Sequence, residues 1–204
     1  MKQQKKIGTT RGRPSRRHEI VAAAETLVRT RGLSSVTTRA IAEQAGCSEA
    51  ALYVHFDNRL ELLLAVLEES LPDMLVPLKA LEQSVGTLTP QQNLAKALGT
   101  IFAFHERVVP MLCGLFAEPQ LLTAYRESLT TRSKGPQGAI ARLQKYISAE
   151  QTLGRIDRTV DAETAATMLM ASSFFKAFVS KFFGTPAPSA AVLKKLAAAA
   201  INRN

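Results

Sequence analysis

Apolar side chains recur along this chain at the three- and four-residue spacing of amphipathic helices, from residue 15 onward. In the first such segment Ile20, Ala24, Leu27 and Val28 fall on one stripe, and Gly32 follows as a stop signal. The alternating β-branched pattern of strands, bounded by turns, is nearly absent. The pattern therefore predicts an all-α fold.

Two short helices follow the first one closely. The sequence predicts a helix after Thr37, a turn at Gly46, and a third helix that Ser48 caps and whose Leu52 and Phe56 face inward. A helix, a glycine-containing turn and a second helix in this order have the spacing of a DNA-binding helix-turn-helix. An ordinary helical hairpin has the same local pattern, so the spacing alone leaves both interpretations open.

The rest of the chain is divided by prolines. The pattern predicts an amphipathic linking segment over residues 59–80, which Pro72 and Pro77 disturb, and then shorter helices. The breaks expected between those shorter helices are at Pro110, Pro119 and Gly135-Pro136.

Three later segments carry strong helix signals. Thr89 is followed by Pro90 and, three positions on, by Gln92, which together predict a capping box and a helix start. Residues 161–183 are apolar on more than one face, and a helix of that kind has to be covered on both sides. An alanine-rich helix is predicted over residues 189–201.

Positive charge is concentrated ahead of the first acidic residue, Glu19. Of the net charge of +9, seven positive charges precede it and only +2 remains for the other 187 residues. Such asymmetry indicates a polyanion bound at one end, with nucleic acid first and an anionic membrane surface second. A solubilising tail is the remaining interpretation. The seven basic residues are Lys2, Lys5, Lys6, Arg11, Arg13, Arg16 and Arg17.

Several classes of protein are disfavoured by what the sequence lacks. No uninterrupted apolar run approaches the roughly 18 residues of a membrane span, so a soluble protein without a membrane partner is expected. With only Cys47 and Cys113, a disulfide framework is implausible and the cytoplasm is the natural compartment. No GxSxG, P-loop, HExxH or paired-cysteine motif occurs, so neither an enzyme, a metal site nor a cofactor is expected.

The stretch VTTRAIAEQAGCSEAALYVHFDNRLELLLAVL, residues 36–67, resembles the DNA-binding domain of the TetR (tetracycline-repressor) family of transcriptional regulators. With the first helix included, the resemblance covers roughly residues 16–67, and beyond that it rests on size and helical layout. It implies a basic flexible arm over residues 1–14 and a helix-turn-helix domain over 15–58. A ligand-binding and dimerisation domain over 59–204 would follow, with 59–80 as its linking helix.

The resemblance also implies roles for individual residues. Backbone contacts position the protein on DNA, whereas base edges in the major groove carry the sequence information. Expected backbone contacts are Thr38, Ser48, Tyr53, His55 and Arg59. Expected base contacts are Arg39, which suits guanine, and Glu49, Ala50 and Ala51, which form a thin code for cytosine N4 and thymine methyl groups.

The sequence Arg11-Gly12-Arg13-Pro14 resembles the core of an AT-hook. In that motif an extended backbone lets arginines enter a narrow, A·T-rich minor groove of enhanced negative potential. We therefore expect Arg11 and Arg13 to lie in the minor groove. Arg16 and Arg17 are expected on phosphates.

The second domain is expected to hold an effector and to form a dimer. An apolar pocket with a few polar groups is predicted from Phe102, His105, Met111, Phe116, Tyr125, Met168 and Phe175, although such residues at helical spacing also build ordinary cores. The dimer interface is predicted to include Phe174, Phe178, Phe182, Leu193 and Leu196.

The resemblance, together with the charge pattern, implies a homodimeric transcription factor, most often a repressor in this family, which binds double-stranded DNA at a pseudo-palindromic operator and which a small-molecule effector releases. One alternative is an architectural DNA binder with little sequence preference that uses the arm. The other is a helical bundle whose basic tail binds a membrane, although that tail lacks aromatic anchors.

Overall fold

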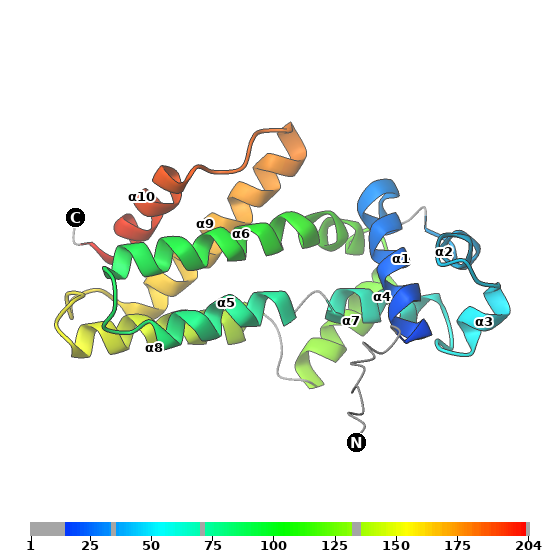
Figure 1. The fold of residues 1–204 in the computed structure, drawn as a ribbon, viewed down its shortest axis with the longest axis horizontal. Coiled ribbons are helices and arrows are strands. Elements are labelled where there is room, and N and C mark those ends of the chain that lie inside the picture. The colour runs from blue at the N-terminus through cyan, green and yellow to red at the C-terminus, as the bar shows by residue number, and fades with distance from the viewer. Residues whose placement is uncertain (1–14, 34–35, 70–71, 132–135, 203–204) are drawn as a thin grey trace, which may run out of the picture.

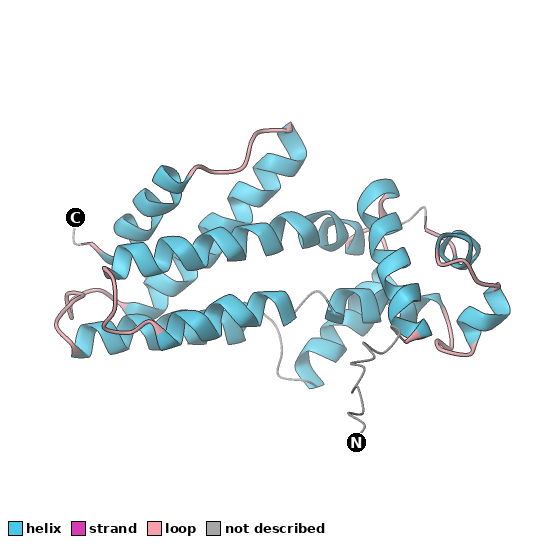
Figure 2. Cartoon of the chain, viewed as in Figure 1, coloured by secondary structure: helices cyan, strands magenta, loops and turns pink. Residues whose placement is uncertain are grey.

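The computed structural model describes residues 15–33, 36–69, 72–131 and 136–202, and these ranges contain helices and no strand (Figure 2). The helices described are α1 (Arg16–Arg31), α2 (Thr38–Gln44), α3 (Glu49–Tyr53), α4 (Arg59–Glu69), α5 (Pro72–Gln83), α6 (Pro90–Leu115), α7 (Pro119–Thr131), α8 (Pro136–Thr152), α9 (Ala162–Phe183) and α10 (Ala190–Ile201). The molecule is elongated, with α1–α3 at one end and α10 toward the other (Figure 1). The all-α prediction is confirmed.

Side-chain caps fix the starts of the first three helices. The hydroxyl groups of Ser15, Thr37 and Ser48 accept hydrogen bonds from backbone N–H groups in the first turns of α1, α2 and α3. Gly32 ends α1 with a φ of 79°, and Gly46 lies between α2 and α3 with a φ of 64°. A positive φ is accessible to glycine at little cost. The predicted starts of these helices and the predicted end of α1 agree with the structure, whereas α3 ends at Tyr53 and does not extend to Phe56 as predicted.

A shared apolar core holds α1–α4 together as what we call the head. Ile20 of α1, Leu52 of α3 and Leu62 of α4 are almost completely buried, as is Phe56 just after α3. Each such side chain contributes about 1.5–3 kcal/mol when it is fully buried. The stripes that the sequence predicted to face inward are the buried ones.

Prolines act as helix starts more often than as breaks. Pro72, Pro119 and Pro136 are the first residues of α5, α7 and α8, where the missing N–H has no helical partner to lose. The linking segment expected over 59–80 is instead two helices, and α5 continues through Pro77 to Gln83.

Pro110 does not divide a helix, so that expectation is wrong. It lies inside α6, which runs from Pro90 to Leu115 after the predicted capping box at Thr89. A proline inside a helix costs about 3 kcal/mol, and burial of the adjoining Val109 and Met111 offsets this cost.

Helix α6 is the central element of the bundle. It packs against α9, α10, α5 and α1. Among the described helices it is long and apolar enough to cross a membrane by length and composition, but half of its most apolar window is buried inside the protein. Its apolar character is therefore that of a core helix.

A buried polar cluster ties the bundle together at the end far from the head. The Glu150 carboxylate is completely buried, accepts from the Gly86 N–H at 3.1 Å and lies 3.2 Å from Arg155 Nε. Arg155 also donates to the carbonyls of Thr87 and Leu88. Burial raises the pKa of the neighbouring Tyr146 to about 12. This cluster joins the α5–α6 turn to the α8–α9 turn.

Helix α9 is covered on one side only. Leu169, Ser173 and Ala177 are buried against the bundle. The described part of the chain therefore does not cover the second apolar side that the sequence predicted for this helix. Its exposed large apolar side chains are Met168, Phe174, Phe175, Phe182 and Phe183.

Candidate nucleic-acid interface and ligand cavity

Helix α3 presents a short face to the solvent. Glu49 and Ala50 are exposed, Ala51 is half-buried, and 49% of Tyr53 is accessible. Leu52, on the opposite side, is buried. The residues expected to contact bases therefore lie on a free surface of the described chain.

Acidic neighbours occupy two of the side chains expected to contact DNA. The Thr38 hydroxyl donates to the Glu49 carboxylate at 2.7 Å, which joins the start of α2 to the start of α3. Arg39 donates to Glu43 at 3.2 Å, one helical turn away on the same surface. Both members of this second pair are more than two-thirds exposed. An exposed pair of this kind contributes roughly 0–1 kcal/mol, so DNA can displace it at little cost.

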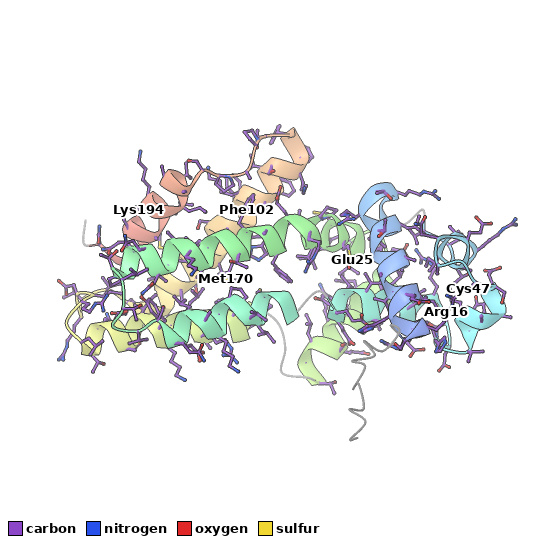
Figure 3. The ribbon with its side chains drawn as sticks, in the orientation of Figure 1. Arg16, Glu25, Cys47, Phe102, Met170 and Lys194 are labelled. Carbon is purple, nitrogen blue, oxygen red and sulfur yellow. The ribbon has the colours of Figure 1, made fainter. Side chains whose placement is uncertain are left out.

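Arg16 and Arg17, expected on phosphates, are held within the head. Arg16 donates to the Gly46 carbonyl at 2.6 Å and to Glu19 at 2.7 Å, so it ties the helix-turn-helix turn to α1. Arg17 donates to Glu69 of α4 at 2.7 Å, and its guanidinium lies 5.0 Å from the centre of the Phe56 ring. Figure 3 shows Arg16 close to Cys47 in the turn. Sequence reasoning missed Gly46 and Glu69 because both partners are distant along the chain.

Arg59 joins three parts of the molecule. Its Nε donates to the Val36 carbonyl and its Nη2 to the Leu33 carbonyl, both at 2.9 Å. The same guanidinium contacts both carboxylate oxygens of Glu118, just before α7, at 3.1 and 3.3 Å. These bonds occupy the guanidinium that the resemblance assigned to the DNA backbone. Arg59 instead joins the α1–α2 loop to the bundle.

Close backbone packing reinforces this junction. A Cβ added to Gly114, near the end of α6, would lie 2.8 Å from the Cβ of Leu33. Any side chain at this position would therefore push α6 away from the loop after α1. We call Leu33, Val36, Arg59, Gly114 and Glu118 the junction.

The other expected DNA contacts are less informative. Ser48 caps α3, and its hydroxyl accepts from the Ala51 N–H at 3.1 Å. His55 is half-buried beside the end of α3. Arg11 and Arg13 lie outside the described residues. Val54, which the sequence reasoning did not single out, is 79% exposed next to Tyr53.

A cavity of about 260 Å³ lies between the head and the centre of the bundle. Helices α4 to α9 all contribute to its wall. The lining residues are Leu67, Met74, Phe104, His105, Val108, Leu112, Tyr125, Leu129, Pro136, Met170 and Phe174.

His105 is the most buried polar side chain of the cavity wall. Its Nδ1 lies 3.0 Å from the Ser173 hydroxyl of α9, and its ring meets the Phe174 ring edge-on at 5.6 Å between centroids. Burial lowers the pKa of His105 to about 4, so the imidazole is neutral near pH 7. Burial, and secondarily Glu68, raises the pKa of Tyr125. Both polar groups are therefore uncharged at neutral pH.

The structure brings together two of the seven residues from which the pocket was predicted, His105 and Tyr125. Phe102 packs with Val109 in a separate cluster, and Met111 lies in the main core. The remaining three predicted pocket residues are exposed and do not line the cavity: Phe116, Met168 and Phe175. Spacing along α6 and α9 gave no means of telling which apolar face meets the cavity.

A larger and more open groove of about 650 Å³ runs along α5 and α6. Lys96 and Arg107 lie at different points on its wall. Phe104 borders both the groove and the cavity. It is buried and forms the wall between them.

The predicted dimer residues differ in exposure. Phe182 is 69% exposed and stacks on the half-buried Phe178, at 5.5 Å between ring centroids. Phe174 borders the cavity. Leu193 and Leu196 of α10 are half-buried against the core, and Leu193 lies close to Gly99 of α6.

The fold and this surface are those of a helix-turn-helix DNA-binding domain joined to a helical bundle. Residues 20–66 match the family model described as bacterial regulatory proteins, tetR family. The N-terminal part of the chain is thus similar to the DNA-binding domain of TetR-family regulators.

Relatives with curated names match about half of the chain. The nucleoid occlusion factor SlmA of Aliivibrio fischeri is 38% identical over 99 residues, which are 47% of this chain and 48% of that one. The transcriptional activator FasR of Mycolicibacterium smegmatis is 34% identical over 95 residues, 46% of this chain and 42% of that one. The chain therefore spans about half the length of the curated relatives it matches.

Solved structures share the fold over nearly the whole chain. A TetR-family regulator from Mesorhizobium loti aligns with a TM-score of 0.71 at 19% identity, covering 91% of this chain and 92% of that one. FadR from Bacillus subtilis, solved with stearoyl-CoA, aligns with a TM-score of 0.66 at 17% identity over 90% and 97%. At this identity the likeness establishes the fold alone.

Proposed function

We propose that this protein is a homodimeric, sequence-specific repressor that a small-molecule effector releases from DNA. The observation that carries the proposal is the position of the cavity. Leu67 of α4 lines it, and Arg59 at the other end of the same helix holds the loop between α1 and α2. An occupant of the cavity would therefore act on the helix that orients the head.

In this proposal α3 enters the major groove. Glu49 accepts a hydrogen bond from cytosine N4 and Ala50 contacts a thymine methyl group, while Tyr53 and His55 contact phosphates. Arg39 leaves Glu43 and donates to a guanine. Thr38 leaves Glu49 and meets a phosphate at the start of α2. The contacts of Thr38 and Arg39 replace exposed internal hydrogen bonds, so the head needs little rearrangement to bind.

The arm supplies affinity that the short face of α3 lacks. Arg11 and Arg13 would enter the minor groove beside the site. Deletion of residues 1–14 should weaken binding and flatten the dependence of log K on log salt by about 0.9 for each lost phosphate contact. A titration of binding against salt measures this slope. A slope that is unchanged by the deletion contradicts the role of the arm.

The exposed apolar side of α9, together with α10, is the proposed dimer interface. Apolar patches as large as this are unusual on monomers and mark interaction surfaces. Met168, Phe175 and Phe182 are spaced by seven residues along α9, so they form one stripe. Pairing about a two-fold axis would place two α3 helices at successive major grooves, about 34–36 Å apart.

An effector in the cavity would favour a conformation in which the two heads no longer fit successive grooves. The cavity wall includes four residues of α6, and Gly114 at the end of α6 touches the loop after α1. A ligand shifts this equilibrium only by its difference in affinity for the two conformations. The stearoyl-CoA complex of FadR supports a ligand site within this fold. We place the protein in the cytoplasm, on the chromosome.

A second candidate is an architectural DNA binder with little sequence preference. The similarity to nucleoid occlusion factors favours it, as does the small number of polar groups on the outer face of α3.

One experiment separates the two candidates. Duplexes selected from a random pool by the full chain would be compared with unselected duplexes at a single salt concentration. The repressor proposal expects an affinity ratio of about 10³ or more, with a palindromic consensus. Nearly equal affinities would favour the architectural binder. Sedimentation of the free protein at micromolar concentration tests the dimer.

A further inference from the structure

Among the described residues, the wall of the cavity contains no side chain that is ionised at neutral pH. Nine of its eleven lining residues are apolar, and the two polar ones are His105 and Tyr125. The low pKa of His105 and the raised pKa of Tyr125 keep both side chains uncharged. Glu68, the carboxylate that helps to raise the pKa of Tyr125, accepts a hydrogen bond from the Ser128 hydroxyl at 2.6 Å and does not line the cavity. A charged ligand would therefore find no counter-ion here, and burying an unpaired charge costs several kcal/mol.

The hydrogen bond to Ser173 leaves one atom of His105 for a ligand. Nδ1 faces the serine hydroxyl, so Nε2 is the remaining polar atom of the ring. A neutral imidazole offers Nε2 either as an acceptor or as a donor, according to which nitrogen carries the proton. The hydroxyl of Ser173 can serve as the partner in both cases. His105 can thus bind either one donor or one acceptor of an uncharged ligand.

The volume and the rings limit the size and shape of the ligand. A dry apolar cavity of about 150 Å³ holds benzene, whereas drug-sized ligands occupy roughly 300–1,000 Å³. A cavity of about 260 Å³ fits one substituted ring or two fused rings. The rings of Phe104 and Phe174 lie on the cavity wall beside His105, at 5.7 and 5.6 Å from it. They provide edges and faces against which a flat ring packs favourably.

We propose that the effector is an uncharged compound of one or two rings whose single hydrogen-bonding group binds His105. This inference rests on the proposed function, because it names the class of molecule that the regulator senses. It excludes fatty-acid anions, acyl-coenzyme A and cationic compounds as occupants of this cavity.

Three matched probes test the charge requirement on the full-length wild-type protein without DNA. At pH 7, 2-naphthol is neutral, 2-naphthoate is an anion and 2-naphthylmethylammonium is a cation, while the fused ring is the same. Calorimetric titration should give 2-naphthol at least about a tenfold lower Kd than either ion. Equal or tighter binding of an ion overturns the proposal, and so does a failure of 2-naphthol to bind.

Matched variants test whether 2-naphthol binds in the cavity. Leu129 lines the cavity, whereas Leu122, a half-buried leucine on the same helix, does not. Leu129→Phe should fill the cavity and weaken 2-naphthol at least about tenfold, while Leu122→Phe should leave its Kd unchanged. Leu112→Phe provides a second filled cavity if thermal melting shows that the first variant is unfolded. Unchanged binding in a folded filled variant overturns the location.

His105→Leu tests the hydrogen bond. In the wild type 2-naphthol should bind more tightly than naphthalene, and His105→Leu should abolish that preference while retaining naphthalene binding. A preference that persists in the variant contradicts the role of His105. The duplex-selection experiment is independent of these titrations. Loss of sequence preference there refutes the proposed function, whereas specific DNA binding combined with ion-selective probe binding refutes only the effector class.

Discussion

The head and the bundle use polar groups in different ways. In the head, Arg16, Arg17 and Arg59 donate hydrogen bonds to carbonyls and carboxylates of neighbouring elements. The bundle holds all the buried polar side chains of the described residues, which are Asn93, His105, Glu150, Ser173 and Ser180, and the described cavity wall has two polar side chains, His105 and Tyr125. In this head, three basic side chains that the resemblance assigned to DNA are instead bonded to neighbouring parts of the protein and hold its elements together. The cavity of the bundle, with an apolar wall and two uncharged polar groups, is therefore a more selective binding site than the head.

The largest expected effect concerns the exposed apolar side of α9, which neither the head nor the rest of the described bundle covers. Phe182→Glu places a charge in the proposed dimer interface, where burying it costs several kcal/mol. The dimer should dissociate at concentrations at which the wild type is associated, with a loss of more than about 100-fold in dimer affinity. Sedimentation velocity measures this effect. Lys79→Glu, at an exposed position on α5 outside the proposed interface, serves as a comparison, and equal sedimentation of wild type and Phe182→Glu would refute the interface.

The next effect falls on the buried cluster of the bundle. Glu150→Ala removes a fully buried carboxylate from Arg155 and from the Gly86 N–H. The free energy of unfolding should fall by about 3 kcal/mol, because the remaining groups lose their partner. Urea denaturation gives the value. Glu163→Ala, at an exposed position on α9, should change it by less than about 0.5 kcal/mol.

The junction gives a smaller effect, shared by both regions. Arg59→Ala should lower the free energy of unfolding by about 2 kcal/mol, because it removes bonds to two carbonyls and to Glu118. The salt dependence of DNA binding should stay the same, because the Arg59 guanidinium is bonded to Leu33, Val36 and Glu118 rather than free to contact a phosphate. If the salt slope of the Arg59→Ala variant is smaller than that of the wild type by about 0.9, Arg59 contacts a DNA phosphate.

The smallest effect on the fold should come from Arg39, although its effect on DNA is specific. Its side chain is 80% exposed, so Arg39→Ala should leave stability nearly unchanged. Preference at one base pair should fall by about 1–3 kcal/mol. Competition between duplexes that differ at single positions measures this. A uniform loss on every duplex would make Arg39 a phosphate contact.

The junction shows why part of the site was beyond sequence reasoning. Arg59 and Glu118 are separated by 59 residues, and no periodicity relates a basic residue at the start of α4 to an acidic one just before α7. The pairing of Thr38 with Glu49 also crosses between two helices. The pairing of Arg39 with Glu43 lies within one helix at a four-residue spacing, so the sequence alone could have predicted it.

The cavity shows the same limit for apolar residues. Of the residues from which the pocket was predicted, His105 and Tyr125 line the cavity, whereas Phe116 and Met168 are exposed. Helical spacing fixes which residues share a face. It does not fix which neighbouring helix that face meets.

The sequence by itself determined the helices of the head, because caps, positive-φ glycines and a 3.6-residue apolar period act over a few positions. Tertiary structure alone decided that Pro110 continues α6, that Arg59 holds the junction, and which apolar residues line the cavity. These outcomes depend on burial and on partners that lie dozens of residues away. Packing free energy, rather than local preference, sets them.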